Sequence, residues 1–303
     1  MTGRDSIFFP GEAWSRVPAG LPLVALLTGY RDAGSTVLQT VESLLDEGDA
    51  EIVAGFDIDS LFDYRARRPI IRVEGTQITE YRLPRLDLRL VRDSMGQQFL
   101  LLSGFEPDFR WSAFTASLRQ LISHFEVSTV TWAHAIPMPV PHTRPIRLAV
   151  TGTREDLIEQ LSVWHATVEA PAHALHELEF ELTAESFPIV DLVVLVPHYL
   201  ADGVLPATAL RLIEAIGTAS GLLLATEQLR ERDREFRLEF ESSLEENEEA
   251  QRLISVLETQ HDGFLRGNPL ENPFADADGE LPSADSIAAE LERYLKTRAD
   301  EEK

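Results

Sequence analysis

Two aspartates, Asp57 and Asp59, directly follow a short apolar run at residues 51–56. Side chains two residues apart on a strand lie on the same face, so both carboxylates could bind one Mg²⁺. The competing interpretation is a solvated strand end with turn-forming aspartates. We favour this second interpretation because short Asp-x-Asp pairs are common, and we predict no cofactor.

A glycine-bounded turn, Gly29-Tyr30-Arg31-Asp32-Ala33-Gly34, precedes a predicted helix at residues 35–45. The backbone N–H groups at the start of such a helix can bind an anion. The turn matches neither Gly-x-Gly-x-x-Gly nor the Gly-Lys-Ser/Thr of a phosphate loop, and Asp32 would repel a phosphate. A tight turn that needs glycine is therefore the favoured interpretation.

Histidines supply the remaining candidate bases and metal ligands. His173 and His176 are three residues apart on a predicted helix, but no His-Glu-x-x-His pattern accompanies them and nearby glutamates suggest a wet face. His134, His142 and His198 lie at predicted strand ends. No Gly-x-Ser-x-Gly motif is present, and we assign no catalytic residue.

Apolar runs alternate with amphipathic helices along residues 1–224, which predicts one α/β domain. The continuous apolar runs at 21–28 and 189–196 are typical of strands covered on both faces. Strand 21–28, helix 35–45 and strand 51–56 form a unit that predicts parallel neighbouring strands. We therefore expect a three-layer fold with a mostly parallel sheet between two layers of helices. Other predicted elements are a hairpin at 68–80, strands at 86–92, 98–102, 127–132 and 147–150, and helices at 109–125, 154–162, 172–182 and 205–218.

Several unusual segments follow predicted strands. Ligands of open α/β sheets bind at the carboxyl ends of the strands, so we expect these segments to meet at one edge of the sheet. One of them, Pro137–Pro145, has four prolines in nine residues and should be neither a helix nor an interior strand. The segments are 28–34, 57–59, 103–108, 136–145 and 197–199.

The composition excludes several classes of function. The chain has no cysteine, which rules out disulfides, thiolate metal ligands and cysteine nucleophiles. Its net charge of −24 should repel nucleic acid and anionic lipid, so neither is an expected partner. No apolar run approaches the roughly 20 residues of a membrane helix, and we expect a cytoplasmic protein.

Residues 225–303 are predicted to form an acidic helical extension. They carry a net charge of −12, from 22 acidic and 10 basic residues. A long amphipathic helix is expected at 225–261, a mobile linker at 263–282 and a short final helix at 287–294. The narrow apolar stripe of the long helix could pack on the main domain or on an antiparallel helix, or it could form an oligomer contact.

Four segments taken together resemble the proteasome assembly chaperone family, and most closely its bacterial branch of uncharacterised proteins. They are Thr28-Gly29-Tyr30-Arg31-Asp32-Ala33-Gly34, Arg67-Arg68-Pro69, Ile136–Pro145 and Val196-Pro197-His198-Tyr199-Leu200. The resemblance implies an α/β fold like that of nucleoside phosphorylases and hydrolases, with a helical C-terminal extension. It also implies a homo-oligomer, with a trimer favoured.

Two hypotheses follow for the function. In the first, the chain is a non-enzymatic, oligomeric binding or assembly-chaperone-like protein with an unidentified protein partner. In the second, it binds or converts a nucleoside-like or anionic small molecule at the strand ends, with His142 or His198 as the base and Arg144 as an anion clamp. The candidate ligand or partner site comprises Gly29, Tyr30, Arg31, Asp32, Gly34, Asp57, Asp59, Arg68, His142, Thr143, Arg144, His198 and Tyr199.

Overall fold

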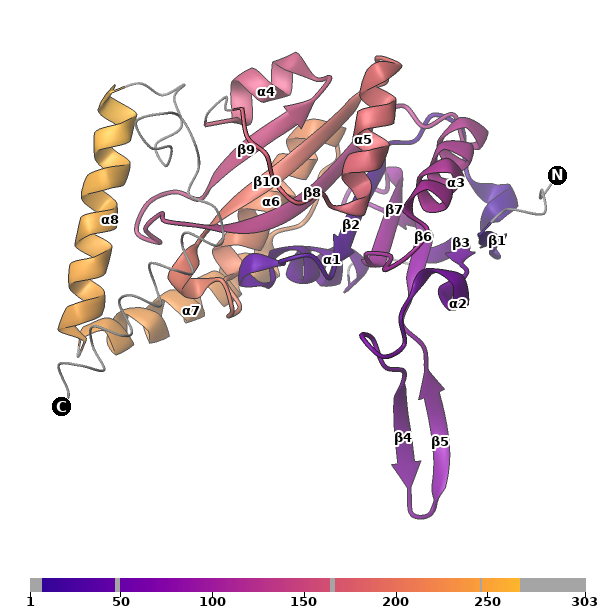
Figure 1. Cartoon of the computed structure of the whole chain (residues 1–303), viewed down its shortest axis with the longest axis horizontal. Coiled ribbons are helices and arrows are strands. Elements are labelled where there is room, and N and C mark those ends of the chain that lie inside the picture. Colours follow the sequence, from indigo (N-terminus) through magenta and orange to yellow (C-terminus); the bar gives the residue numbers. More distant parts are fainter. Residues whose placement is uncertain (1–6, 47–49, 164–166, 246, 268–303) are drawn as a thin grey trace.

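The computed structural model describes residues 7–46, 50–163, 167–245 and 247–267, and its centre is an eight-stranded sheet (Figure 1). In spatial order the strands are β1 (Phe8–Pro10), β3 (Glu51–Phe56), β6 (Leu86–Arg92), β7 (Gln98–Phe105), β2 (Leu23–Thr28), β8 (Val130–Met138), β10 (Ile189–Pro197) and β9 (Arg147–Gly152). The inner strands β7, β2, β8 and β10 pair in parallel, and the outer pairs are antiparallel.

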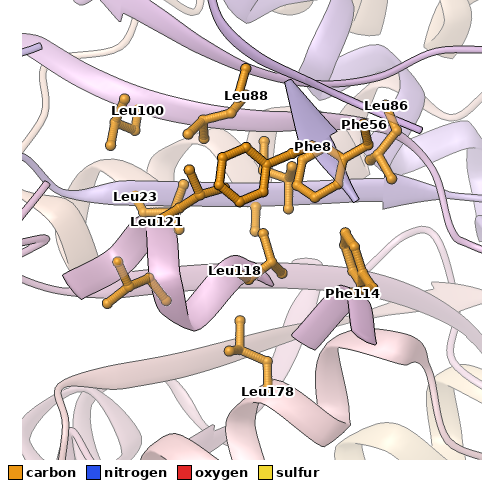
Figure 2. Close-up of a cluster of buried hydrophobic side chains, with 14 of the residues drawn as sticks. Phe8, Leu23, Phe56, Leu86, Leu88, Leu100, Phe114, Leu118, Leu121 and Leu178 are labelled. Atoms are coloured by element: carbon orange, nitrogen blue, oxygen red, sulfur yellow. The ribbon is translucent and has the colours of Figure 1, made fainter. Parts of the chain in front are cut away.

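Helices cover both faces of this sheet. On one face lie α3 (Trp111–His124) and α5 (Ala174–Ala184); on the other lie α1 (Thr36–Asp46) and α6 (Pro206–Ser220). Strand β2 shows the division, because Leu23, Ala25 and Leu27 join the α3–α5 cluster whereas Val24 and Leu26 join the α1–α6 cluster. Figure 2 shows the first cluster, in which leucines of α3 and α5 point toward the strands. The predicted three-layer α/β fold is confirmed.

The sheet is mixed rather than mostly parallel along its whole width. The sequence predicts that strands β2 and β3 are parallel neighbours. They do run in the same direction, but the antiparallel pair β6–β7 lies between them, so the prediction that they are neighbours is wrong. Three of the seven neighbouring pairs are parallel. The helix between β2 and β3 therefore carries the chain past two later strands, which local periodicity cannot reveal.

Strand β8 runs further into the proline-rich segment than expected, because it includes Pro137 and Met138. Its pairing with β2 stops at Ala133, whereas its pairing with β10 continues to Met138. Beyond Ala133, the side of β8 that faces β2 is therefore not paired with that strand. A proline, which has no N–H to donate, is tolerated on such an edge.

The predicted long C-terminal helix is two helices, α7 (Glu227–Glu245) and α8 (Glu248–Gly267). The side chain of Asn247 accepts the N–H of Ala250 at 3.0 Å and so caps the start of α8. Leu229 of α7 is buried against Ala209 and Ile213 of α6. The stripe therefore packs on the main domain at this point, one of the two expected alternatives.

Helix α8 also contains residues 263–267, which had been expected in a mobile linker. The rest of that linker and the predicted final helix at 287–294 lie outside the described residues. Two short α-helices also precede α5, namely α2 (Ile58–Leu61) and α4 (Glu155–Leu161). No helix among the described residues is long and apolar enough to cross a membrane.

The predicted hairpin is present as β4 (Ile70–Glu74) and β5 (Gln77–Arg82), which form a separate two-stranded sheet. It extends away from the rest of the molecule below the edge where α2 lies (Figure 1). No other described element packs substantially against either strand.

Candidate functional site

The carboxyl ends of five strands meet at one edge of the sheet, as the sequence predicted. Strands β3, β7, β2, β8 and β10 all run in the same direction, so the segments after them share this edge, called the rim here. Five strand spacings of about 4.8 Å separate β3 from β10, or roughly 24 Å. The candidate residues are therefore spread along the rim in separate groups.

The glycine turn forms the first group, and its polar groups are used within the fold. The carboxylate of Asp32 accepts the N–H groups of Val37 at 2.7 Å and Leu38 at 2.9 Å, which caps α1. Burial raises the pKa of Asp32, and these hydrogen bonds partly offset the rise. Gly34 has a φ of 67°, and its N–H donates to the carbonyl of Ala201 at 2.7 Å. This arrangement supports the tight-turn interpretation of the segment.

Tyr30 and Gly29 link the turn to distant segments. The hydroxyl of Tyr30 donates to the carbonyl of Pro171 at 3.1 Å. Gly29 has a φ of 118° and lies beside the guanidinium of Arg67, so an added Cβ would come within 2.7 Å of that side chain. Arg31 also has a positive φ, of 27°.

The Asp-x-Asp pair does not have the strand geometry assumed from the sequence. Strand β3 ends at Phe56, so Asp57 precedes α2 and Asp59 lies within it. The carboxylate of Asp59 accepts a hydrogen bond from the hydroxyl of Tyr64. The argument that both carboxylates share one face of a strand therefore does not hold.

Arg67, rather than its neighbour Arg68, holds the loop after α2 against the rim. Arg67 forms an ion pair with Asp108 and lies 5.7 Å from the ring centre of Phe62 and 5.4 Å from that of Phe105. Arg68 is exposed. The sequence motif Arg-Arg-Pro contained Arg67, but nothing local distinguished the buried arginine from the exposed one.

The proline-rich segment and the Pro-His-Tyr segment come together at the other end of the rim. The hydroxyl of Tyr199 accepts the backbone N–H of His142 at 2.8 Å and lies 2.7 Å from its Nδ1. The ring of His142 also stands edge-on to Phe240 of α7. Burial lowers the pKa of His142 and of His198, so both imidazoles are neutral near pH 7.

Arg144 connects this group to α8. Its guanidinium lies 3.0 Å from the carboxylate of Glu258 and 2.7 Å from that of Asp262. Thr143 donates to the same glutamate. The expected anion clamp is thus already neutralised by two carboxylates, and in this structure it holds the C-terminal helices to the proline-rich segment.

A cavity of about 520 Å³ lies beside this group, between the proline-rich segment and helices α4, α6 and α7. Arg147 and Arg211 line it together with Arg144 and Arg237. Sequence reasoning missed Arg147 and Arg211, because one lies at the start of a strand and the other on a helix with no motif around it.

A buried polar cluster lies under α5, where a wet helix face had been expected. One ligand atom each of His134, His176 and Asp191 lies within 4.8 Å of the others, and Nδ1 of His134 is 3.3 Å from Oδ1 of Asp191. Glu179 accepts hydrogen bonds from Trp132 at 2.8 Å and Thr151 at 2.7 Å. The feature of the sequence that could have indicated this cluster is Asp191, an aspartate inside the apolar run of β10.

The donor set of this cluster suits proton sharing better than metal binding. Nδ1 of His176 accepts the backbone N–H of His173 at 2.8 Å. A neutral imidazole then carries its proton on Nε2, which leaves His176 no lone pair for a metal ion.

Burial and neighbouring charges shift the pKa values of the groups in this cluster in different directions. Burial lowers the pKa of His134, but the carboxylate of Asp191 raises it above its usual value overall. Burial lowers the pKa of His173 to about 3 and, with the charge of Asp191, raises the pKa of Glu179 to about 7. Glu179 therefore gains or loses its proton near neutral pH.

The model of the PAC2 family matches residues 26–243 of this chain. A Corynebacterium glutamicum protein of unknown function is 32% identical with a TM-score of 0.83, covering 87% of this chain and 100% of that one. A Mycobacterium tuberculosis protein of unknown function is 31% identical with a TM-score of 0.81, covering 87% and 91%. No functionally curated protein matches the chain.

A more distant structure shares the fold. The Mycobacterium tuberculosis proteasome-assembly chaperone homologue is 22% identical with a TM-score of 0.70, covering 77% of this chain and 100% of that one. Together with the family match, it confirms the resemblance to the proteasome assembly chaperone family that the four sequence segments indicated.

Replacing Asp32 should affect stability because its carboxylate caps α1. We expect Asp32→Ala to lower the free energy of unfolding by about 1–2 kcal/mol, the usual cost of losing such a cap. Asp57→Ala is the matched control, since Asp57 makes no side-chain capping bond to α2, and should change stability by less than about 0.5 kcal/mol. Urea denaturation measures both, and equal effects would contradict the assigned role.

Glu179 should make the protein less stable as the pH rises. Between about 4.5 and about 7, the folded state keeps a proton on Glu179 that the unfolded state has released, so stability falls across this window. The loss should reach about 3 kcal/mol, and Glu179→Gln should remove it while still accepting from Trp132. Urea denaturation at several pH values tests this, and an unchanged pH dependence in Glu179→Gln would disprove it.

Proposed function

This chain belongs to the PAC2 family, and from that membership we propose that it is a non-enzymatic, homo-oligomeric binding protein of the assembly-chaperone type, acting in the cytoplasm. The observation that carries the proposal is the protruding hairpin with its supporting loop, residues 65–85, called the arm from here on. The naming of a structural neighbour as a proteasome-assembly chaperone homologue supports the assembly role.

One face of the arm is apolar and exposed. The register pairs Ile71 with Tyr81 and Val73 with Ile78, which places these four side chains on the same face. Each of them is between 48% and 64% exposed. Large apolar side chains gathered on one exposed face are typical of a protein-binding surface.

The opposite face of the arm carries internally paired charges beside the exposed side chain of Ile70. Arg72 lies 3.3 Å from Glu80, and Arg82 also lies 3.3 Å from Glu80. The arm is thus amphipathic, and no other described element packs substantially on its apolar side (Figure 1). A two-stranded hairpin is at best marginally stable alone in water, so a partner that covers the apolar face would stabilise it.

Charge favours a second copy of this chain as that partner. The arm contains six arginines and two glutamates, a net charge of +4, and since the whole chain carries −24 the remainder carries −28. Opposite charges on the arm and on the body steer two copies toward contact between unlike surfaces. A heterologous contact of this kind closes into a ring when the rotation allows, which suits the trimer expected from the resemblance.

The contacts that polar side chains make at the rim support a binding role rather than catalysis. Asp32 caps a helix, Arg144 is neutralised by two carboxylates, and His142 is bonded to Tyr199. These side chains, which the second hypothesis placed in a small-molecule site, join segments of the fold to one another.

Changing the arm's apolar face should dissociate the oligomer. We expect the double variant Ile78→Glu, Tyr81→Ser to raise the dissociation constant at least about 100-fold, because each buried side chain contributes about 1.5 kcal/mol or more. Sedimentation velocity over a concentration series measures this. The matched control is Phe180→Glu on α5, where the phenylalanine is 78% exposed but lies outside the arm.

The control should sediment as the unmodified protein does. Higher salt should also weaken the oligomer, because the arm and the body carry opposite charges. A wild-type protein that stays monomeric at every concentration would refute the proposal, and so would a double variant that associates as strongly as the control.

A further inference from the structure

The cavity beside the proline-rich segment has the size and position of a ligand site. It has a volume of about 520 Å³, within the range of roughly 300–1,000 Å³ typical of small-molecule pockets. It lies where β9 begins opposite the carboxyl end of β10, since Arg147 pairs with Leu195. Side chains of four segments line it, including Gln160 of α4, Arg211 of α6 and Arg237 of α7.

Two of the four arginines that line the cavity are neutralised within the fold. Arg144 is paired with Glu258 and Asp262, and Arg237 is paired with Asp233 at 2.8 Å. These two guanidinium groups need no further anion.

Arg147 and Arg211 have no such partner. Across the described ranges, neither guanidinium has a carboxylate oxygen within 4.0 Å. Glu214 also lines the cavity, but its carboxylate lies 2.7 Å from Arg230. The cavity thus holds two guanidinium groups that form no ion pair within the described ranges, in a chain with 51 acidic residues.

The two arginines are also desolvated. Nε of Arg147 is buried and has no hydrogen-bond partner, and a buried N–H of a charged group left unpaired is costly. Burial lowers the pKa of Arg211; the charge of Glu214 partly offsets this fall, and the nearby charge of Arg147 adds to it. Two adjacent guanidinium groups, neither in an ion pair with a described residue, repel each other, and an anion bound between them would offset this repulsion.

From this geometry we infer that the cavity binds a small organic phosphate, with Arg147 and Arg211 as the groups that hold its anionic head. The planar fork of a guanidinium matches the oxygens of phosphate in a bidentate fashion. The inference is independent of the proposed oligomer contact, because none of these residues belongs to the arm.

A second hollow of about 210 Å³ shares several residues with the first and extends it toward α7. Phe236, Phe240 and Ile146 line it, with the neutral imidazole of His142 between the two hollows. An aromatic or apolar group attached to the phosphate would pack there. The site as a whole therefore fits a phosphate ester that carries an aromatic ring, such as a nucleoside monophosphate.

Isothermal titration of the full chain with AMP, adenosine and inorganic phosphate tests the inference. AMP should bind more tightly than inorganic phosphate, and adenosine should bind at least about tenfold more weakly than AMP. Arg147→Gln and Arg211→Gln should each weaken AMP binding at least about tenfold. Arg232→Gln, which changes an exposed arginine of α7 outside the cavity, should bind AMP as the wild type does.

Thermal unfolding provides a readout that separates binding from misfolding. AMP should raise the melting temperature of the wild type and of Arg232→Gln by mass action, but not that of Arg147→Gln or Arg211→Gln. Without ligand, the two cavity variants should melt no lower than the wild type, because each removes an uncompensated charge. Equal binding of adenosine and AMP, full affinity in the cavity variants, or no binding of either phosphate would each overturn the inference.

Discussion

All nine residues of β10 are buried, because helices cover one face of the strand, and α5 together with the segment that follows β8 covers the other. Burial on both sides of the central strands removes a large apolar area from water, and this is the main favourable contribution to folding. Because helices occupy both faces of the sheet, the loops lie at the two ends of the strands. Since β10, β8, β2, β7 and β3 all point the same way, the loops at one end form the rim where the candidate sites lie.

The same burial gives the polar cluster its properties. Asp191 lies inside β10, and its charge is felt by His134 on the neighbouring strand and by Glu179 on α5. In a medium of low dielectric constant, each proton on one of these groups changes the affinity of the others for theirs. The cluster makes the stability of the fold depend on pH near neutrality, and His176 offers no lone pair to a metal ion while its Nδ1 accepts the N–H of His173.

Ion pairs and hydrogen bonds occupy most of the polar side chains at the rim. Asp32 fixes the start of α1, Arg67 fixes the loop below it, and Arg144 fastens α8 to the proline-rich segment. The apolar face of the arm and the guanidinium pair of Arg147 and Arg211 are incompletely satisfied by the described chain. A partner that covers the apolar surface, or an anion that pairs with the guanidinium groups, would bind with a favourable free energy. These two features therefore define the two proposed contacts.

Much of the fold could be predicted from the sequence because it depends on short-range patterns. Continuous apolar runs identified β2 and β10, helical periodicity identified α1, α3 and α6, and Glu74-Gly75 identified the hairpin. These patterns are set by the period of a helix or strand and by turn chemistry, which involve only neighbouring residues. The position of the rim also followed, since parallel strands place their carboxyl ends together.

The tertiary structure alone decided which strands are neighbours, which charges are paired and which histidines are buried. The insertion of β6 and β7 between β2 and β3 depends on contacts between residues far apart in the sequence. For the same reason Arg144 meets α8 while Arg147 forms no ion pair with any residue that the structure describes, although the two are three residues apart. His173 and His176 looked solvent-facing beside glutamates, yet α5 turns them toward the sheet, because a helix exposes only the face that its packing leaves uncovered.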